Sequence, residues 1–324
     1  MAEINFVRAV NRALGDAMAA DDRVILLGED IAAAGGPFGA TRGLKDRFGD
    51  KRVRDTPISE GAIAGAAVGA ALSGLRPVVE IMFMDFTTLA MDALVNQAAK
   101  AHFMFGGQAS VPLVLRTPHG GGVSAGPQHS QCLEAWYAHI PGLRVVCPSN
   151  SGDAYALLRA AIDDDNPVIF VENKALYGVK AEVPDAPPAV RLGDGAIARP
   201  GRDATVVTYG GMVSRALKAA DGLAAEAIEV EVVDLRSLQP WDEALVLRSL
   251  AHTHRLVIAH EAVEAFGIGA EIAARMADIG FDELDAPIVR VGAPFMPVPF
   301  AKELERRYQP DAERIVAAVR RVLE

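Results

Sequence analysis

The chain has 324 residues, which exceeds a typical single domain and suits two. Hydrophobic residues make up 51% and charged residues 23%, a composition typical of a globular protein with a large core. The net charge of −10 argues against nucleic acid or an anionic membrane as the main partner.

The two cysteines, Cys132 and Cys147, follow no metal or redox spacing, so a reducing compartment is expected. The N-terminal segment lacks the basic-then-apolar layout of a signal peptide. The most apolar stretch, residues 62–75, is made largely of alanine and glycine and is too short to span a bilayer. We therefore expect a cytoplasmic protein.

In the first half of the chain, apolar periodicity predicts helices that alternate with short buried strands. The expected helices cover residues 6–18, 61–72, 87–103, 131–138 and 152–163. The expected strands cover residues 24–27, 77–83, 112–116, 143–147 and 168–172. Continuous apolar strands alternating with helices indicate a parallel sheet that is covered on both faces.

A proline-rich stretch then interrupts the pattern, and we interpret residues 186–202 as a linker. The alternation restarts with expected strands at 205–209, 230–234, 256–259 and 288–291 and helices at 214–224, 242–250, 267–277 and the C-terminus. The sequence therefore predicts an α/β protein with one domain over residues 1–185 and another over residues 203–324.

Three segments carry side chains suited to chemistry. Glu60 stands where a strand-like run meets a helix with glycines at four-residue spacing, although an acid is also ordinary in a first helical turn. Phe86 opens the next long helical pattern, where a core role is the simpler interpretation. His129 follows a run of three glycines that cannot pack a core, so that loop could serve a site or a cap.

Other patterns are weaker. A Gly-x-Gly-x-x-Ala match begins at Gly120, but no acidic residue ends a second strand at the expected offset. Ser130 beside His129 lacks the Gly-x-Ser-x-Gly elbow of a hydrolase. His252 and His254 are expected before a strand and His260 at its far end, too far apart to share one metal ion.

Taken together and in order, the motifs are specific. In the first half they are GED at 28–30, GGPFGATRGL at 35–44, DTPISE at 55–60, GLRPVVEIMFMDF, NQAAK, MFGGQ, QHSQ, HIPGLRVVCPS and DDNPVIFVEN. In the second half they are TVVTYGGMV, VEVVDLRSLQPWD, THRLVIAHE and GAPFMPVPFAKELE. Over essentially its whole length the chain resembles the β subunits of the decarboxylating first component of 2-oxo acid dehydrogenase complexes, of the pyruvate or acetoin dehydrogenase type.

The resemblance implies a transketolase-like fold, with a pyrimidine-binding domain followed by a transketolase C-terminal-like domain. It also implies thiamine diphosphate as cofactor, with Glu60 bonded to ring nitrogen N1′ and able to share a proton near neutral pH. His129 matches an active-site histidine suited to proton transfer or oxyanion stabilisation. The residues that match the cofactor's surroundings are Glu29 with its neighbour Asp30, Ile58, Ser59, Glu60, Met82 and Phe86.

The resemblance further implies partners. In such enzymes an α subunit holds magnesium and the diphosphate through Gly-Asp-Gly followed by a distant asparagine. This chain has Gly-Asp-Gly at 193–195 but no asparagine after Asn173, so we treat the match as a decoy and expect a separate α subunit. The expected assembly has two copies of each subunit, with the glycine-rich helix as a close-contact element, docked on a lipoyl-bearing dihydrolipoyl acyltransferase core.

In some relatives a turn also binds potassium through backbone carbonyl groups. The matching residues here are Leu113, Ala161, Ile162, Asp164 and Asn166, although an ordinary structural turn would explain them equally well.

The substrate stays open on the sequence alone. Pyruvate fits the QHSQCLEAWYAHIPGL and ENKALYGV segments, acetoin fits MFGGQA and HIPGLRVVCPS, and a branched-chain 2-oxo acid fits less well. A self-sufficient transketolase-type enzyme is disfavoured by the missing asparagine. A non-catalytic assembly subunit is disfavoured by the presence of Glu60, Phe86 and His129 together.

Overall fold

The computed structural model describes residues 2–186 and 189–324, so residues 187 and 188 of the predicted linker lie outside the described part. The chain forms two compact units. The first contains the described residues through His119 and then Trp136–Leu192, and the second contains Gly120–Ala135 and Gly193–Glu324. The segment that carries His129 thus belongs to the second unit although its neighbours in sequence belong to the first.

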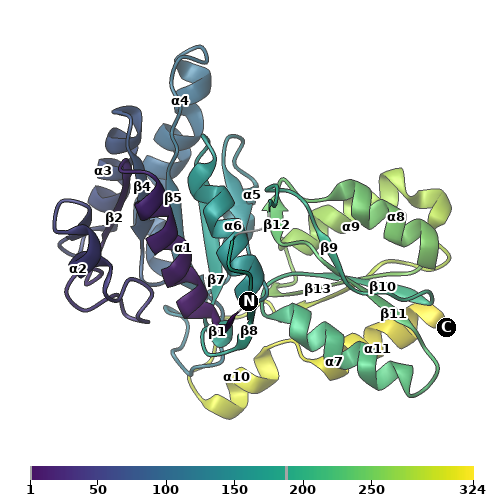
Figure 1. The fold of residues 1–324 in the computed structure, drawn as a ribbon. Coiled ribbons are helices and arrows are strands. Elements are labelled where there is room, and N and C mark those ends of the chain that lie inside the picture. Colours follow the sequence, from purple (N-terminus) through teal and green to yellow (C-terminus); the bar gives the residue numbers. More distant parts are fainter. Residues whose placement is uncertain (1, 187–188) are drawn as a thin grey trace. The chain divides into compact units, whose positions relative to one another are not determined.

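The first unit is built on a parallel sheet with the strand order β6-β7-β5-β4-β2-β3 (Figure 1). Its strands are β1 (Ala2–Asn5), β2 (Val24–Gly28), β3 (Val53–Asp55), β4 (Arg76–Glu80), β5 (Val114–His119), β6 (Arg144–Val146), β7 (Val168–Asn173) and β8 (Lys180–Val183), of which β1 and β8 form a separate antiparallel pair. Its α-helices are α1 (Phe6–Ala20), α2 (Leu44–Phe48), α3 (Glu60–Leu72), α4 (Ala99–Met104) and α6 (Ser151–Asp163), while α5 (Glu134–Ala138) leads the chain back from the second unit.

The helices cover the sheet in two layers. Apolar residues of α1 and α6 pack together with alternate residues of the central strands in one core. Helix α3 packs against β2 and β4, outside that core, and thereby covers the opposite face. Side chains close the helix starts: Asn5 Oδ1 accepts from the Arg8 N–H at 3.1 Å, and Asn150 Oδ1 accepts from the Asp153 N–H at 2.9 Å.

One predicted helix is wrong in detail. Residues 87–103 do not form a single α-helix but follow a 3₁₀ segment (Met84–Ala90), a π-helical segment (Asp92–Ala98) and then α4. The hydroxyl groups of Thr87 and Thr88 donate to the carbonyl groups of Met84 and Asp85, three residues earlier, at 2.5 and 2.9 Å. These local bonds favour the tighter turn over the α-helical pattern.

The second unit contains a five-stranded sheet with the order β14-β13-β10-β11-β9, in which only β9 is antiparallel to its neighbour. In Figure 1, α7 and α11 lie on one face of this sheet and α8 and α9 on the other. The strands of this sheet are β9 (Ala196–Arg199), β10 (Ala204–Thr208), β11 (Val230–Asp234), β13 (Leu256–Val263) and β14 (Val289–Ala293). The short strand β12 (Ser237–Gln239) is not part of it. The helices are α7 (Met212–Ala224), α8 (Glu243–Thr253), α9 (Ile268–Ile279), a short 3₁₀ turn (Phe281–Glu283), α10 (Lys302–Tyr308) and α11 (Ala312–Leu323).

Two features of this unit differ from the prediction. Strand β9 lies inside the stretch predicted as a linker, because Ala196, Ile197 and Arg199 pair with β11. Helix α8 runs to Thr253, so His252 lies in its last turn instead of in a loop, and His260 lies inside β13 instead of at its end.

Candidate active site

The predicted cofactor residues of the first unit gather at one edge of the sheet. Strands β4, β2 and β3 are parallel neighbours, so their carboxyl ends share an edge. Glu29 follows β2, Glu60 follows β3 as the first residue of α3, and Phe86 follows β4 in the 3₁₀ segment. Ile58 and Ser59 precede Glu60, and Met82 lies between β4 and the 3₁₀ segment. In open α/β sheets this edge is where ligands bind.

Glu29 and Glu60 form a buried pair of acids at this edge. Glu29 is 8% exposed and Glu60 is 6% exposed. Burial raises the pKa of Glu29, and the neighbouring charges of Glu60 and Asp30 raise it further, against a hydrogen bond from the Ser59 backbone. A raised pKa lets Glu29 hold a proton closer to neutral pH than an exposed glutamic acid does. Such shifted carboxyl groups are typical of functional sites.

The same edge has one buried polar atom without a hydrogen-bond partner among the described residues and one exposed apolar side chain. Glu29 Oε1 is buried and has no hydrogen-bond partner among the described residues. Ile58, two residues before Glu60, is 84% exposed although isoleucine is usually buried. A buried acceptor and an exposed apolar group at one sheet edge fit a flat heteroaromatic ring with polar edges, such as the aminopyrimidine of thiamine diphosphate.

The raised pKa of Glu29 implies that the folding stability depends on pH. Its folded-state pKa lies above its unfolded value near 4.5, so its contribution to stability is present below that pH and is lost as the pH rises through the folded-state pKa. Glu29→Gln removes this loss because glutamine does not ionise. We expect the variant to raise the thermal midpoint relative to the unaltered chain more at pH 8 than at pH 4.5. Equal differences at both pH values would contradict this prediction.

Phe86 belongs to a row of aromatic rings. Its ring lies edge-on to that of Phe83 at 5.7 Å between centroids, and Phe83 lies edge-on to Phe38 at 5.9 Å. Phe86 and Met82 are both only half-buried, so each retains an exposed apolar surface at the sheet edge. Phe86 is therefore held by its neighbours while part of its ring stays exposed at the sheet edge.

A charged network under this edge was not predicted from the sequence. Arg116 of β5 donates to Glu80 of β4 at 2.7 Å and to both oxygens of Glu172 of β7, at 2.7 and 3.0 Å. The Tyr177 hydroxyl also donates to Glu172, at 2.8 Å. All three charged side chains are at most 7% exposed, and burial with the nearby Glu172 charge raises the pKa of Tyr177 well above its usual value. The available signal was an acid at the end of each of two buried strands.

The predicted potassium residues lie at two places in the chain. Leu113 directly precedes β5, and Ala161, Ile162, Asp164 and Asn166 lie at the end of α6 and just after it, where an arginine already makes contact. The Arg76 guanidinium donates to the carbonyl groups of Ile162 and Asp164 at 2.9 and 3.1 Å. The Leu113 carbonyl accepts from the Val168 N–H at 2.8 Å, and Asn166 donates to the Asp164 side chain. Carbonyl oxygens suit potassium, yet Arg76 supplies positive charge to two of the five residues. Potassium at Leu113, Ala161, Ile162, Asp164 and Asn166 stays a prediction.

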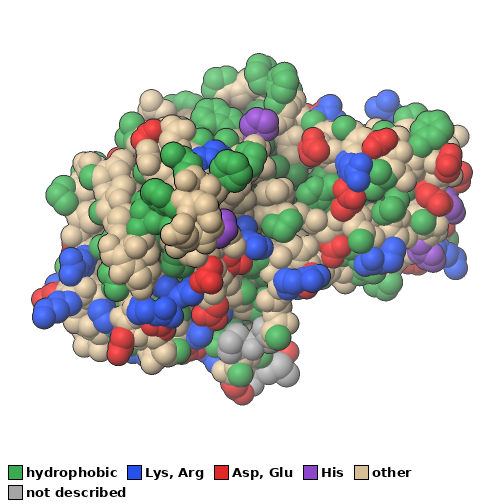
Figure 2. All heavy atoms as spheres, turned by 90° about the horizontal axis from the view of Figure 1, so that it is seen from above, with side chains coloured by type: hydrophobic (Ala, Val, Ile, Leu, Met, Phe, Trp, Pro, Cys, Tyr) green, Lys and Arg blue, Asp and Glu red, His purple; other side chains and the backbone are tan. Residues whose placement is uncertain are grey.

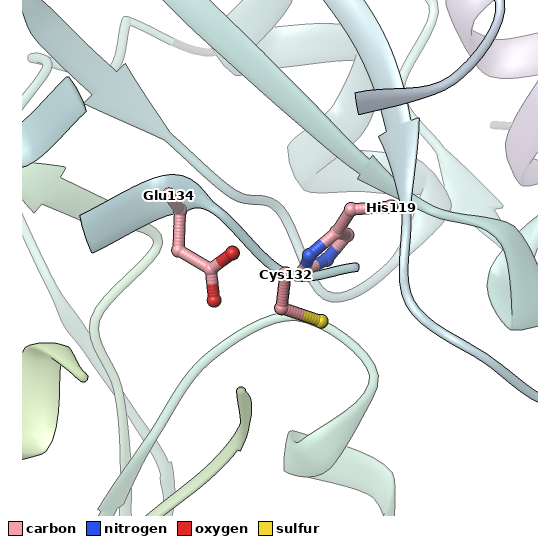
Figure 3. Close-up of side chains that lie close together, drawn as sticks. All are labelled: His119, Cys132 and Glu134. Carbon is pink, nitrogen blue, oxygen red and sulfur yellow. The ribbon is translucent and has the colours of Figure 1, made fainter. Parts of the chain in front are cut away.

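His129 lies in the second unit, on a loop that we define as residues 120–133 and call the His129 loop. It is half-buried and comes just before α5. Figure 3 shows Cys132 and Glu134 at the end of the loop, with Glu134 opening α5. The Tyr209 hydroxyl donates to Glu134 at 2.7 Å, which ties the end of the loop to the strand β10 region.

A cavity of about 520 Å³ adjoins the His129 loop within the second unit. Gln128 and Ser130, on either side of His129, contribute to its wall. The lining also includes residues between β14 and α10 and residues of β13, among them Phe295, Met296, Val298, Glu261, Ala262 and Val263. A concave, mostly apolar pocket with a few polar groups is the usual form of a small-molecule site.

The Gly-Asp-Gly segment of the second unit has local partners. The Gly193 N–H donates to Ser237 Oγ at 3.0 Å, and the Gly195 N–H donates to Asp242 at 3.1 Å. Arg236 donates to the carbonyl groups of Asp194 and Gly195. With the Gly193 and Gly195 amide groups committed in this way, the segment is a turn before β9 and not a pre-formed phosphate cradle.

Comparison with known proteins identifies the family. Residues 2–180 match the transketolase pyrimidine-binding domain, and residues 193–315 match the transketolase C-terminal domain. The chain is 45% identical to a mitochondrial pyruvate dehydrogenase E1 component subunit beta-2 of Oryza sativa, over 98% of this chain and 86% of that one. It is 47% identical to the β subunit of acetoin:2,6-dichlorophenolindophenol oxidoreductase of Cupriavidus necator, over 98% and 96%.

The chain belongs to the family of pyruvate and acetoin dehydrogenase β subunits. The predicted family and its two-domain, transketolase-like α/β fold are thereby confirmed. Among solved structures, a split-gene transketolase described as an inactive β4 tetramer superposes with a TM-score of 0.82 at 25% identity, covering 99% of this chain and 98% of that one. Members of this family are oxidoreductase components with a pyrimidine-binding domain, so the expectation of an enzyme subunit that uses thiamine diphosphate is also confirmed.

Two further observations concern membrane-spanning segments and the charge on the surface. In the described residues, no helix combines the length and apolarity needed to cross a membrane. Acidic and basic side chains are interspersed on the face drawn in Figure 2.

Proposed function

We propose that this chain is the β subunit of a thiamine-diphosphate-dependent pyruvate dehydrogenase that transfers an acetyl group to a lipoyl arm. The observation that carries the proposal is the buried Glu29–Glu60 pair, with Glu60 at the start of α3, in a chain about 45% identical to pyruvate dehydrogenase β subunits. An enzyme that must keep a carboxyl proton available near neutral pH needs an acid in such surroundings.

In this proposal each residue has a defined task. The cofactor, when bound, supplies the carbon nucleophile that adds to the 2-oxo carbon of the substrate, and it stabilises the negative charge that decarboxylation leaves. Glu60 holds a proton at ring nitrogen N1′. Glu29 is a second carboxyl group beside it, with a raised pKa. Phe86, Met82, Ile58 and Ser59 pack around the pyrimidine ring. His129 moves a proton at, or stabilises charge on, the substrate oxygen.

The proposal includes partners. An α subunit would hold magnesium and the diphosphate, since the Gly-Asp-Gly amides of this chain already have local partners. The assembly would contain two copies of each subunit and would dock on a lipoyl-bearing dihydrolipoyl acyltransferase core. Helix α3 offers a surface for close subunit contact, because Gly65 and Gly69 are exposed and a side chain at either position would meet no described atom within 4 Å.

Oxidation of acetoin is the second candidate, because β subunits named acetoin:2,6-dichlorophenolindophenol oxidoreductase are as similar to this chain as the pyruvate enzymes. The oxidoreductase β subunits of Cupriavidus necator and Bacillus subtilis are 47% and 46% identical to this chain. A branched-chain 2-oxo acid such as 3-methyl-2-oxobutanoate is the third candidate, and a non-catalytic assembly subunit is the alternative from another class.

A substrate comparison tests the proposal. The chain would be produced together with a candidate α subunit from the same source, supplied with thiamine diphosphate and magnesium, and assayed with pyruvate, acetoin and 3-methyl-2-oxobutanoate. We expect the highest kcat/KM with pyruvate and none for either subunit alone. A higher kcat/KM with acetoin would make acetoin the substrate and leave the proposed cofactor chemistry unchanged. Turnover by the isolated β subunit would contradict the proposal that an α subunit is needed to hold magnesium and the diphosphate.

A further inference from the structure

The His129 loop is rich in glycine and includes backbone conformations that residues with a side chain rarely adopt. Gly122 and Gly126 have φ angles of +95° and +75°, and Ser124 has φ of +57°, which is unusual for a residue with a side chain. Such a loop has many alternative conformations when it is unrestrained. Something outside the loop must therefore select the observed one.

Two buried carboxylates of the second unit bind the backbone of this loop. The N–H groups of Gly122 and Ser124 donate to the two oxygens of Glu305, at 2.9 Å each. The Gly121 N–H donates to Glu261 Oε1 at 2.8 Å. Glu305 of α10 is 3% exposed and Glu261 of β13 is 6% exposed, so these charge-assisted bonds are shielded from water.

Glu261 is in turn held by a neighbour outside the loop. Gln309, at the end of α10, donates to Glu261 Oε1 at 3.1 Å and accepts from Arg215 of α7 at 3.1 Å. The fit is close, because a Cβ atom on Gly121 would lie 2.5 Å from Gln309 Nε2 and 3.0 Å from Glu305 Oε1. A Cβ on Gly126 would overlap the Phe300 ring. The loop is therefore seated on the C-terminal domain at several points.

We propose that Glu305 and Glu261 are positioning residues, which hold the His129 loop in the conformation that the reaction requires. Their oxygens fix three of the four residues 121–124, and this fixed segment sets where His129 stands five residues later. The inference rests on the role proposed for His129. A misplacement of about 1 Å in a group that transfers a proton can reduce a rate by roughly 100-fold.

Glu305→Gln tests the inference, because it keeps the size of the side chain and turns an acceptor into an NH₂ group that faces a loop N–H. In the α/β pair we expect kcat to fall roughly 10- to 100-fold, with little change in the Kd of thiamine diphosphate. The matched control is Glu303→Gln on the same helix, whose side chain is 70% exposed and pairs only with its neighbour Arg306 among the described residues. We expect this control to retain the original kcat.

A double-mutant cycle with His129→Ala separates positioning from an independent effect. If Glu305 acts through His129, adding Glu305→Gln to His129→Ala causes no further loss of kcat. A further loss equal to that of the single variant would overturn the inference. Full activity of His129→Ala would instead overturn the proposed role of His129.

Amide hydrogen exchange gives a readout that does not depend on activity. In Glu305→Gln we expect the amides of Gly122 and Ser124, which donate to Glu305, to exchange at least about tenfold faster, while those of strands β10 and β11 keep their rates. Unchanged exchange in the loop would overturn the inference even if His129 proves essential. Faster exchange throughout the second unit would do so too, since it would mean that the domain itself had loosened.

Discussion

Glu60→Gln is expected to reduce 2-oxo acid decarboxylation by the α/β pair about 10³-fold, within the range by which a positioned acid or base accelerates a reaction. Glutamine keeps the size of the side chain and its start of α3, but it cannot share a carboxyl proton with a ring nitrogen. Assembly with the α subunit should be preserved. The measurement is steady-state decarboxylation combined with size-exclusion chromatography of the pair.

A matched control distinguishes lost chemistry from a weakened helix. Glu271 is also an acid in the first turn of a helix, α9, and it is exposed. Glu271→Gln removes the same interaction with the helix N-terminus, worth a few tenths to 1 kcal/mol, and should leave turnover unchanged. Undiminished turnover in Glu60→Gln would show that this acid only caps its helix.

Arg116→Met is expected to have the largest effect on stability, a loss of about 3–5 kcal/mol in the free energy of unfolding, or failure to fold. Arg116 forms ion pairs with both Glu80 and Glu172. Its replacement removes the positive charge that both buried carboxylates contact. Urea denaturation followed by circular dichroism measures the loss. Adding Glu80→Gln and Glu172→Gln to the variant should restore much of the stability, because the uncompensated charges are then gone.

Arg275→Met provides the comparison on the surface. Arg275 makes the same kind of paired contact with Glu243, at 2.7 and 3.1 Å, but both side chains are about 40% exposed. An exposed pair of this kind contributes about 0–1 kcal/mol. If Arg116→Met cost no more than Arg275→Met, the buried network would have no special role in the fold.

The sequence was sufficient for the parts of the molecule that depend on local pattern. Alternating apolar strands and helices predicted the α/β class, and helices such as α1 and α6 lie within two residues of their predicted bounds. The order of motifs along the chain identified the family. The residues predicted to surround the pyrimidine gather at one sheet edge because parallel neighbours end together.

The parts that escaped prediction depend on contacts between distant residues. Arg116, Glu80 and Glu172 lie on three strands, and the local sequence shows acids near two strand ends without indicating that they share one arginine. Glu305 lies more than 180 positions from the amides that it binds. The form of the 3₁₀ segment depends on the hydrogen bonds that the Thr87 and Thr88 hydroxyl groups donate to carbonyl groups three residues earlier. Periodicity describes which face of an element is apolar, and it carries no information about such choices.

The assignment of residues 120–135 to the second unit affects how members of this family can be recombined. A chimera joined near residue 190 would combine one parent's histidine segment with another parent's carboxylates, although the two halves look like separable modules in sequence. Exchange of the C-terminal half should succeed only when residues 120–135 are exchanged with it. A working boundary for protein engineering in this family therefore consists of two cuts.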